Sequence, residues 1–376
     1  MNDYRRILII KPSSLGDVVQ ALPTLAALRD RFPKAYIAWF VKRQWAGLLE
    51  RAEGLDVVWP VDGTLKGWLR EILRLRASGF DLVVDLQGLL RSGVAAWLTG
   101  CPVRIGFDNA REGSPWFYSH RVPVPTPEMH AVDRYLLVAS SLGAVSRGSP
   151  EFRLRAQSGD DAEVTGLLAR YGLKAGAAWI AMNVAARWPT KRWPPEFFAA
   201  SADWIQTEGL GSVVLLGGPD DRELASAVKE RMRTVPIDLT GATTPGLLPA
   251  LLGAATLLLT NDSGPMHVAV AVGTPVVALF GPTSPVRTGP YGAGHRVLSS
   301  GVPCSPCFSR TCRNTVNLEC LKAISPDKVI EAVRDQLQLR AKACRGRGSK
   351  FDVPDRASEV RDPDTSKLEH RPPLRP

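Results

Sequence analysis

Apolar positions along the chain fall into short, uninterrupted runs that alternate with longer amphipathic stretches. The runs have the length of strands and predict strands at residues 6–10, 35–41, 56–60, 81–85, 178–182, 212–216, 256–260 and 276–280. Runs of this kind are typical of strands buried on both faces of a parallel sheet. The amphipathic stretches predict helices at residues 18–32, 65–76, 131–142, 195–207, 222–232, 247–254, from 265, and 326–343. This alternation predicts βαβ units.

The alternation stops once and then restarts. A polar, loop-like segment covers residues 143–158, after which the second series of strands begins. We therefore predict an α/β protein with two Rossmann-like parallel-sheet domains that face each other across a cleft, residues 1–155 and 156–343. Residues 344–376 are rich in proline and charge and poor in aromatic residues, which predicts a disordered tail.

The composition narrows the class of protein. Hydrophobic residues make up 45% and charged residues 22%, which is typical of a globular chain and excludes a collagenous, coiled-coil or wholly disordered one. No apolar run reaches the roughly 18 residues of a membrane span, and the N-terminus lacks a secretory apolar region, so we expect a cytoplasmic protein. The net charge of +10 suits nucleic acid, an anionic membrane surface or phosphorylated substrates.

The loops that follow the strands hold the unusual residues. Ligands of open α/β sheets bind beyond the carboxyl ends of strands, so these loops are the candidates for chemistry. The loop at residues 13–17 ends in Asp17, which either points into the cleft or caps the following helix. The loop at residues 183–193 holds Lys191, which either reaches phosphate oxygens or lies on a solvated basic turn.

Three later loops add a possible nucleotide site. Residues 217–223 combine two glycines with carboxylates that either bind ribose hydroxyls or favour a helix N-terminus. Residues 261–267 read Asn-Asp-Ser-Gly-Pro-Met-His, where a helix capped by Ser or Asp, with Pro in its first turn, leaves backbone N–H groups free for an anion. Residues 281–285 follow what we take as the last strand and are expected to form a rigid loop that carries two hydroxyls.

Taken together, these loops resemble glycosyltransferase family 9, the ADP-heptose:lipopolysaccharide heptosyltransferases. The resembling segments follow the family's order: residues 7–23, 85–88, 187–193, 261–267 and 280–285. The resemblance spans roughly residues 5–335. It implies a GT-B fold, with an N-terminal acceptor-binding domain and a C-terminal domain that binds the nucleotide sugar.

The resemblance also implies a role for individual residues. Asp17 matches the general base and Lys191 the lysine that contacts the diphosphate. The positions that match the nucleotide-sugar site are Asp221 (or Glu223 after a short slip), Thr243, Asp262, Ser263, Gly264 and His267. The positions in acceptor-facing segments are Gln87, Arg91, Arg111 and Arg134. The implied reaction is the inverting transfer of a heptose to the Kdo (3-deoxy-manno-octulosonic acid) or heptose of the lipopolysaccharide inner core.

The implied partners are ADP-heptose and an anionic lipid A-core acceptor at the inner membrane surface, with no nucleic acid, and we expect a monomer. No metal cofactor is required if Lys191 and a helix N-terminus neutralise the leaving ADP. The stretch at residues 65–76 sets four cations beside apolar residues. It is either an interfacial amphipathic helix, peripheral to the cytoplasmic face, or an ordinary domain helix. The loops at 13–17 and 289–292 favour addition of the first heptose.

Four of the six cysteines form a cluster, Cys304, Cys307, Cys312 and Cys320. Thiolates at such short spacing suit structural zinc, while reduced cysteines or local disulfides are the alternatives. We place this cluster away from the chemistry.

Two other classes of protein remain as alternatives. One is a GT-B enzyme that uses another nucleotide sugar, either a different transferase or an epimerase. The other is a nucleic-acid-binding protein, suggested by the net charge and the cysteines. The basic residues are scattered and match no nucleic-acid-binding module, which argues against the second class.

Overall fold

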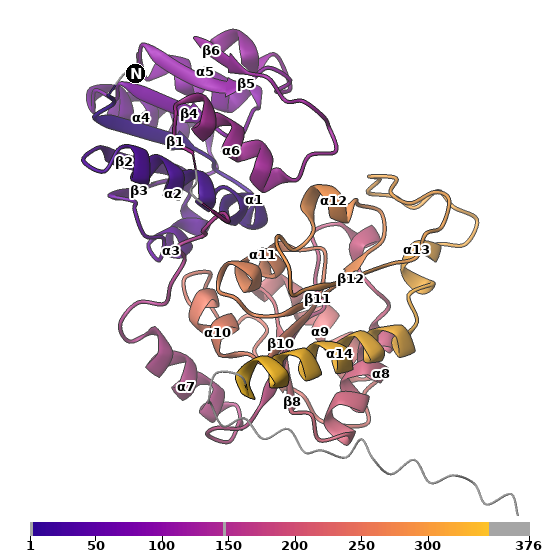
Figure 1. Cartoon of the computed structure of the whole chain (residues 1–376). Helices are drawn as coiled ribbons and strands as arrows, with labels where there is room; N and C mark the ends of the chain where they lie inside the picture. Colours follow the sequence, from indigo (N-terminus) through magenta and orange to yellow (C-terminus); the bar gives the residue numbers. More distant parts are fainter. Residues whose placement is uncertain (1–2, 146–147, 346–376) are drawn as a thin grey trace, which may run out of the picture. The chain divides into compact units, whose positions relative to one another are not determined.

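The computed structural model describes residues 3–145 and 148–345 and contains two parallel sheets of six strands each (Figure 1). The first sheet has the order β3-β2-β1-β4-β5-β6. Its strands are β1 Arg6–Ile10, β2 Tyr36–Lys42, β3 Val57–Val61, β4 Leu82–Asp85, β5 Val103–Phe107 and β6 His120–Val122. The second sheet has the order β12-β11-β10-β7-β8-β9. Its strands are β7 Trp179–Asn183, β8 Ser212–Leu216, β9 Ile237–Asp238, β10 Leu257–Asn261, β11 Val276–Phe280 and β12 Arg296–Ser299.

Both sheets follow one plan. In each, the chain starts at a central strand, runs outward to one edge, and then returns to pair on the other side of the first strand. The direction therefore reverses between β1 and β4 and again between β7 and β10. Ligands of open α/β sheets bind at such switch points, so the loops after these four strands are the places where a site is expected.

Helices cover both faces of the first sheet. They are α1 Leu15–Gln20, α2 Leu22–Arg31, α3 Ala46–Leu49, α4 Leu65–Ala77, α5 Leu90–Leu98 and α6 Ala131–Ser141, with 3-10 turns η1 Arg43–Trp45 and η2 Ser114–Phe117. Helices α4 and α5 bury Trp68, Ile72 and Ala96 in one core layer. Helices α1 and α6 bury Val18 and Tyr135 in the layer on the opposite face.

The second sheet is covered in the same way. Its helices are α7 Asp160–Arg170, α8 Pro195–Thr207, α9 Arg222–Lys229, α10 Leu248–Ala254, α11 Gly264–Ala271, α12 Pro285–Thr288, α13 Glu319–Lys322 and α14 Pro326–Arg345, with 3-10 turns η3 Pro189–Lys191 and η4 Pro219–Asp221. Helices α8, α9 and α14 bury Phe198, Ala225 and Val333 on one face. Helices α10 and α11 bury Leu251 and Met266 on the other.

The α/β prediction is confirmed, and all eight expected strands are present within about a residue of their predicted bounds. Strands β5, β6, β9 and β12 were not predicted, so the strand at Val276–Phe280 is not the last one. The helix predicted at residues 18–32 is two helices, because the turn at Ala21 separates α1 from α2. Helix α14 continues to Arg345, and the rest of the predicted tail lies outside the described residues.

Residues up to Leu337 form one compact unit that contains both sheets, and a second unit begins at Gln338. The first sheet ends at Val122 and the second begins at Trp179, and the domain boundary at residues 155/156 stays a prediction. No helix within residues 3–145 and 148–345 is long and apolar enough to cross a membrane.

Candidate active site

Asp17 lies in the first turn of α1, directly after the first switch-point strand. The backbone N–H and the hydroxyl of Ser14 both donate to Asp17 Oδ2, at 2.9 and 2.6 Å, so Asp17 does cap its helix. The hydroxyl of Tyr135 donates to the other carboxylate oxygen at 3.3 Å. The side chain nevertheless stays 41% exposed. Asp17 is therefore both a capping residue and a carboxylate that a substrate can reach.

A buried lysine lies beneath Asp17. Lys11 Nζ is 3.8 Å from Asp17 Oδ1, donates to the carbonyl of Leu86 at 3.1 Å, and has a side chain only 4% exposed. Burial alone would raise the pKa of Asp17, but the charge of Lys11 and the hydrogen bonds from Ser14 outweigh it and hold that pKa below its usual range. Burial alone would lower the pKa of Lys11, but Tyr135 and Asp17 together raise it above its usual value. Both groups are therefore charged at neutral pH.

A second lysine–aspartate pair lies at the other switch point. Lys191 Nζ, from η3, is 2.5 Å from Asp262 Oδ2, which follows β10. The hydroxyl of Thr283 donates to the same oxygen at 2.7 Å, so the loop after β11 contributes as well. Asp262 is 6% exposed and Lys191 is 18% exposed, which makes the lysine the more accessible partner.

The N-terminus of α11 lies beside this pair. Asn183, at the end of β7, donates to the Ser263 hydroxyl at 2.7 Å and so holds the residue that precedes the helix. The helix begins at Gly264, and its first N–H groups have no partner within the helix. A lysine and a helix N-terminus at one place can bind an anionic group such as a diphosphate.

His267 joins the two switch points. It is 6% exposed, and burial lowers its pKa to about 4 despite the attraction of Asp262 and Asp17, so the ring is neutral at neutral pH. A Cβ placed on Gly16 would lie 2.6 Å from the ring of His267, and one on Gly264 would lie 2.7 Å from the side chain of Leu15. Only glycine allows α1 and α11 to approach so closely.

The predicted ribose and adenine positions lie on neighbouring loops. The N–H of Gly241 donates to the carbonyl of Gly217 at 2.9 Å, which sets the segment that carries Thr243 beside the loop that carries Asp221. The carboxylate of Asp221 accepts from the N–H of Gly218 at 2.8 Å, so it stabilises its own loop. Glu223, the alternative position, is exposed.

Gln87 lies next to the loop that carries Asp17. Its side-chain oxygen accepts from the N–H of Ser13 at 3.4 Å. Asp85, which is fully buried, accepts from the N–H of Gln87 at 2.9 Å and from the hydroxyl of Tyr118 at 2.7 Å. Burial raises the pKa of Asp85 against these hydrogen bonds. The second switch-point strand of the first sheet therefore positions Gln87 beside the candidate base.

The predicted acceptor arginines divide into two groups. Arg134 donates to Asn109 at 2.8 Å, and burial lowers its pKa, as do the like charges of Arg287 and Arg111. Arg111, Arg134 and Arg287 therefore form one cationic group. Arg91 lies instead over the ring of Trp68, 5.0 Å from its centre, on the face of the sheet that α4 covers. The structure does not bring Arg91 to the other three.

The segment that carries the cysteine cluster contacts the predicted nucleotide loops through residues 308–310, while the position of the cysteines themselves away from the chemistry stays a prediction. The hydroxyl of Thr190 donates to the carbonyl of Ser309 at 2.8 Å, and the N–H of Phe308 donates to the carbonyl of Pro282 at 2.7 Å. The ring of Trp188 contacts two cations, Arg310 at 5.2 Å and Lys191 at 4.7 Å from its centre. Arg310 is therefore a further cation close to the diphosphate loops.

The cysteines themselves are free thiols. This holds for Cys304, Cys307, Cys312 and Cys320 and excludes local disulfides among them in this structure. Over the described ranges, no group of three or more His, Cys, Asp or Glu side chains is arranged to hold a metal ion. Burial raises the pKa of the Cys320 thiol, and Cys304, Cys307 and Cys312 nevertheless lie close enough for their charges to raise it further. Structural zinc therefore stays a prediction.

Lys11, Tyr135, Arg287 and Arg310 are the residues that sequence reasoning missed. Lys11 had a signal, because it extends an apolar run that predicts a buried strand. The other three reach the site only through the tertiary fold.

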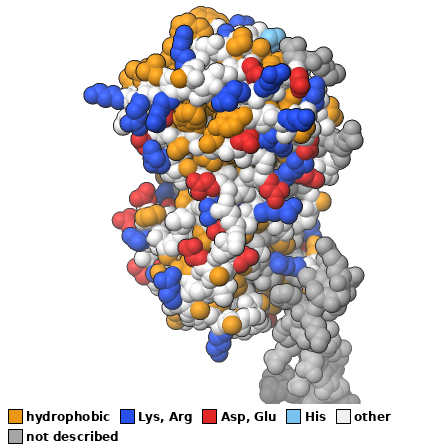
Figure 2. All heavy atoms as spheres, turned by 90° about the vertical axis from the view of Figure 1, so that its left-hand side faces the viewer, with side chains coloured by type: hydrophobic (Ala, Val, Ile, Leu, Met, Phe, Trp, Pro, Cys, Tyr) orange, Lys and Arg blue, Asp and Glu red, His pale blue; other side chains and the backbone are white. Residues whose placement is uncertain are grey.

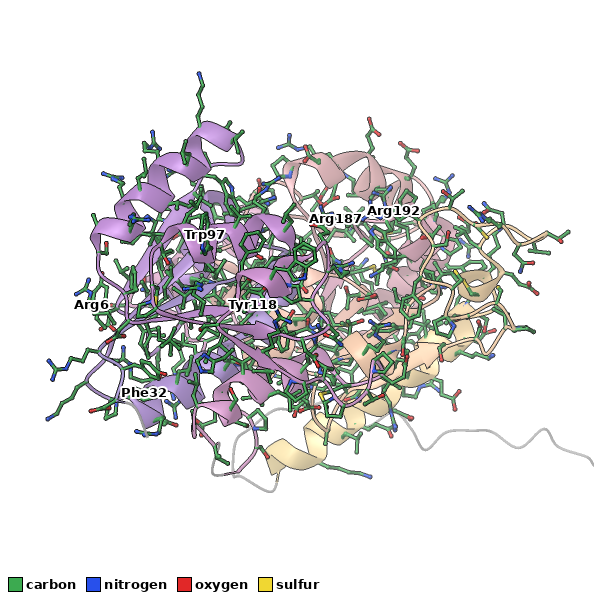
Figure 3. All side chains as sticks on the ribbon, turned by 90° about the horizontal axis from the view of Figure 1, so that it is seen from above. Arg6, Phe32, Trp97, Tyr118, Arg187 and Arg192 are labelled. Carbon is green, nitrogen blue, oxygen red and sulfur yellow. The ribbon has the colours of Figure 1, made fainter. Side chains whose placement is uncertain are left out.

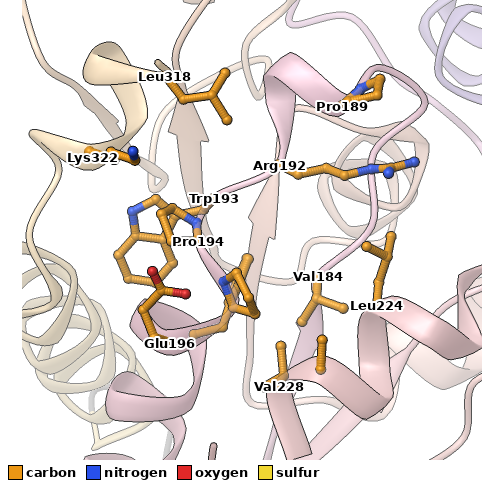
Figure 4. Close-up of a pocket in the computed structure, with 13 residues that line it drawn as sticks. Val184, Pro189, Arg192, Trp193, Pro194, Glu196, Leu224, Val228, Leu318 and Lys322 are labelled. Atoms are coloured by element: carbon orange, nitrogen blue, oxygen red, sulfur yellow. The ribbon is translucent and has the colours of Figure 1, made fainter. Parts of the chain in front are cut away.

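A cavity of about 320 Å³ lies beside the loop that carries Lys191 (Figure 4). Its lining includes Val184, Trp193, Leu224 and Lys322 and is mostly apolar, and neither Lys191 nor Asp262 takes part. The lining also includes two cations, Arg192 and Lys322, which come from different parts of the chain. Arg187 and Arg192 lie near each other on the same loop (Figure 3).

Known structures share this architecture. The structure of a family 9 glycosyl transferase from Veillonella parvula superimposes with a TM-score of 0.78 and is 29% identical, covering 90% of this chain and 98% of that one. The E. coli ADP-heptose heptosyltransferase II structure gives a TM-score of 0.74 at 24% identity, covering 89% of this chain and 99% of that one. The two sheets and the loops between them are those of a GT-B glycosyltransferase.

The sequence comparison identifies the family. The model of glycosyltransferase family 9 (heptosyltransferase) matches residues 68–317. Lipopolysaccharide heptosyltransferase 1 of Pseudomonas aeruginosa is 31% identical over 326 residues, which cover 82% of this chain and 87% of that protein. The chain belongs to glycosyltransferase family 9.

Proposed function

We propose that this glycosyltransferase transfers a heptose from ADP-heptose to the lipopolysaccharide inner core, with inversion at the anomeric carbon. The observation that carries the proposal is the pair of switch-point sites, with an accessible carboxylate at Asp17 and an accessible lysine at Lys191 beside the N-terminus of α11. The Pseudomonas aeruginosa relative is a lipopolysaccharide heptosyltransferase, which supports the choice of sugar and acceptor.

The chemistry assigns one task to each site. The carboxylate of Asp17 accepts the proton of the acceptor hydroxyl while that oxygen bonds to the anomeric carbon. The bond between that carbon and the diphosphate oxygen breaks, and ADP leaves with the electron pair. Lys191 and the N–H groups at the start of α11 stabilise the new charge. A single displacement of this kind inverts the anomeric centre.

The arginine group suits an anionic acceptor. Arg111 and Arg134 come from the first half of the chain and Arg287 from the second. Guanidinium groups bind carboxylates in two-pronged pairs, and Kdo carries a carboxylate. This favours Kdo as the residue that receives the heptose.

The transfer needs no divalent metal in this proposal, because lysine and backbone donors neutralise the diphosphate. We expect ADP release at saturating acceptor to persist after chelation with EDTA. Circular dichroism must accompany the assay, since a chelator that removed a structural metal would act on the fold. Activity that is abolished with the fold intact and restored by Mg²⁺ would contradict this part of the proposal.

A transfer assay with defined acceptors tests the function as a whole. We expect product with ADP-heptose and Kdo-lipid A, and a lower rate with heptosyl-Kdo-lipid A. The same assay with uridine-nucleotide sugars addresses the alternative donors. Binding of UDP in preference to ADP, measured by calorimetry, would replace this proposal with a GT-B enzyme of another specificity.

A further inference from the structure

Helix α4 has a second apolar side that the protein does not bury. Leu65, Leu69 and Leu73 are 83%, 51% and 60% exposed. They are spaced four residues apart and therefore form one stripe along the helix. The opposite side of the helix already supplies the core through Trp68 and Ile72. The stripe is therefore not part of the packing of the domain.

The exposed side of α4 is also strongly basic. Lys66, Arg70, Arg74 and Arg76 are all exposed. The one carboxylate of the helix, Glu71, is 6% exposed and pairs inward with Arg70 at 2.9 Å and Arg74 at 3.3 Å. The leucines are thus surrounded mainly by cations: Glu71 is buried beneath them, and the partly exposed carboxylate just before the helix, Asp62, is 3.8 Å from Arg70. Figure 2 shows hydrophobic side chains among Lys and Arg side chains over the upper part of one face.

Helix α5 extends this surface. It packs on the same face of the first sheet as α4, so the outer sides of the two helices turn away from the sheet together. The guanidinium of Arg76 donates to the carbonyl of Leu98 at 3.3 Å and links the helices. Leu90 and Trp97, seven residues apart on α5, are 46% and 54% exposed. An amphipathic ring such as that of Trp97 suits the headgroup level of a bilayer.

We propose that the outer surface of α4 and α5, which we call the leucine face, docks the protein on an anionic lipid bilayer. Its leucines enter the boundary between headgroups and acyl chains, and Lys66, Arg70, Arg74 and Arg76 contact lipid phosphates. Charge favours a bilayer over a second copy of the chain. Two copies that met through this face would bring their cations against each other, whereas an anionic bilayer would neutralise them. Such a surface would bring the protein to the proposed lipid-bound acceptor. Only this purpose of the surface rests on the proposed function.

Vesicle co-sedimentation of the full-length protein tests the proposal without acceptor or nucleotide. We expect binding to vesicles of phosphatidylethanolamine and phosphatidylglycerol, little binding to phosphatidylcholine, and weaker binding as salt rises. The double variant Leu69→Ser/Leu73→Ser should reduce the partition coefficient about tenfold or more, since two exposed apolar side chains are lost. The matched control is Val235→Ser, which changes an apolar side chain that is 89% exposed outside the leucine face.

A charge variant sharpens the test. Lys66→Glu reverses a charge on the leucine face, and we expect it to weaken anionic-vesicle binding by roughly tenfold. Lys174→Glu, at an exposed position outside the face, makes the same change in net charge and should have a much smaller effect.

Three results would overturn the proposal. The first is wild-type protein that does not bind anionic vesicles, and the second is a serine variant that binds as well as wild type. The third is a dimer in light scattering that the serine variant loses, which would assign the leucine face to a second copy. Transfer to a water-soluble acceptor should be unchanged in both variants. If the wild-type protein transfers no sugar to that acceptor, the proposed function is refuted, but the vesicle-binding result is unaffected.

Discussion

The two switch points contain the same two residue types in opposite arrangement. After β1, the lysine is buried and the aspartate is accessible: Lys11 is 4% exposed and Asp17 41%. At the nucleotide loops, the aspartate is buried and the lysine is the more accessible: Asp262 is 6% exposed and Lys191 18%. Lys11 holds the pKa of Asp17 below its usual range, and Asp262 fixes the position of Lys191 through an ion pair. Which partner is buried therefore decides whether a sheet offers a proton acceptor or a cation.

Removing the accessible carboxylate should have the largest effect. We expect Asp17→Asn to keep its affinity for ADP-heptose while turnover falls by about 10² to 10⁴, the usual contribution of a general base. Steady-state kinetics and calorimetry measure the two quantities. Tyr135→Phe, which removes one 3.3 Å hydrogen bond to Asp17, is the control and should keep most of the activity. Turnover of Asp17→Asn within a few-fold of wild type would leave Asp17 as a capping residue only.

Removing the accessible lysine should weaken the nucleotide. We expect Lys191→Ala to reduce ADP affinity by roughly ten- to a hundredfold, the range for a charged hydrogen bond. Lys229→Ala is the matched control, because Lys229 also pairs with an aspartate, Asp238, at 2.5 Å in the same half of the chain. Calorimetry with ADP measures both. If Lys191→Ala and Lys229→Ala bind ADP equally well, the diphosphate does not bind at Lys191.

Removing the buried lysine should change the pH dependence rather than abolish activity. Lys11→Met removes the main charge that lowers the pKa of Asp17, so that pKa rises. Because Asp17 works as a base only when ionised, activity is lost as pH falls through its pKa, and the acid limb of kcat/KM should move to higher pH. Lys34→Met, at an exposed position, controls for net charge. A lower rate with an unmoved acid limb would make Lys11 a purely structural residue.

The smallest effect concerns stability. The pKa of His267 is about 4 in the folded protein and near 6.5 when unfolded, so the unfolded chain binds more protons between these values and stability is lost as pH falls from 6.5 to 4. His267→Gln should remove this loss, which is on the order of 1 kcal/mol at pH 5.5. Urea unfolding of both proteins from pH 7 to 5 measures it. If the free energy of unfolding falls equally with pH in both proteins, burial does not lower the pKa of His267.

The sequence predicted seven of the eight interior strands but only one of the four edge strands: it found β3 and missed β6, β9 and β12 at the edges, together with β5 inside the first sheet. Strands such as β1 and β10 are mostly apolar and almost wholly buried, because helices cover both of their faces. Strands β6 and β12 are largely exposed and hold arginine or histidine, so no apolar run marks them. An apolar run reports burial, and β6, β9 and β12 are too exposed or too short to show one, whereas the edge strand β3 keeps an apolar run.

The candidate site was predictable where a loop follows a central strand. Asp17, Lys191 and Asp262 are in such loops, and the structure brings each to a switch point. Arg287 was not predictable, because its link to Arg134 joins residues more than a hundred positions apart through the packing of the two halves. Arg310 was missed for the same reason, since only the fold sets it beside Trp188.

Gly16 and Gly264 set how closely α1 and α11 approach each other. A methyl group on either would lie under 3 Å from its neighbour across the contact of α1 and α11. The acceptor oxygen must come within about 3 to 3.5 Å of the anomeric carbon before the two can react. If the proposed reaction is right, a methyl group at either glycine would push apart the helix that carries Asp17 and the helix N-terminus beside Lys191, while both sites kept all of their chemical groups.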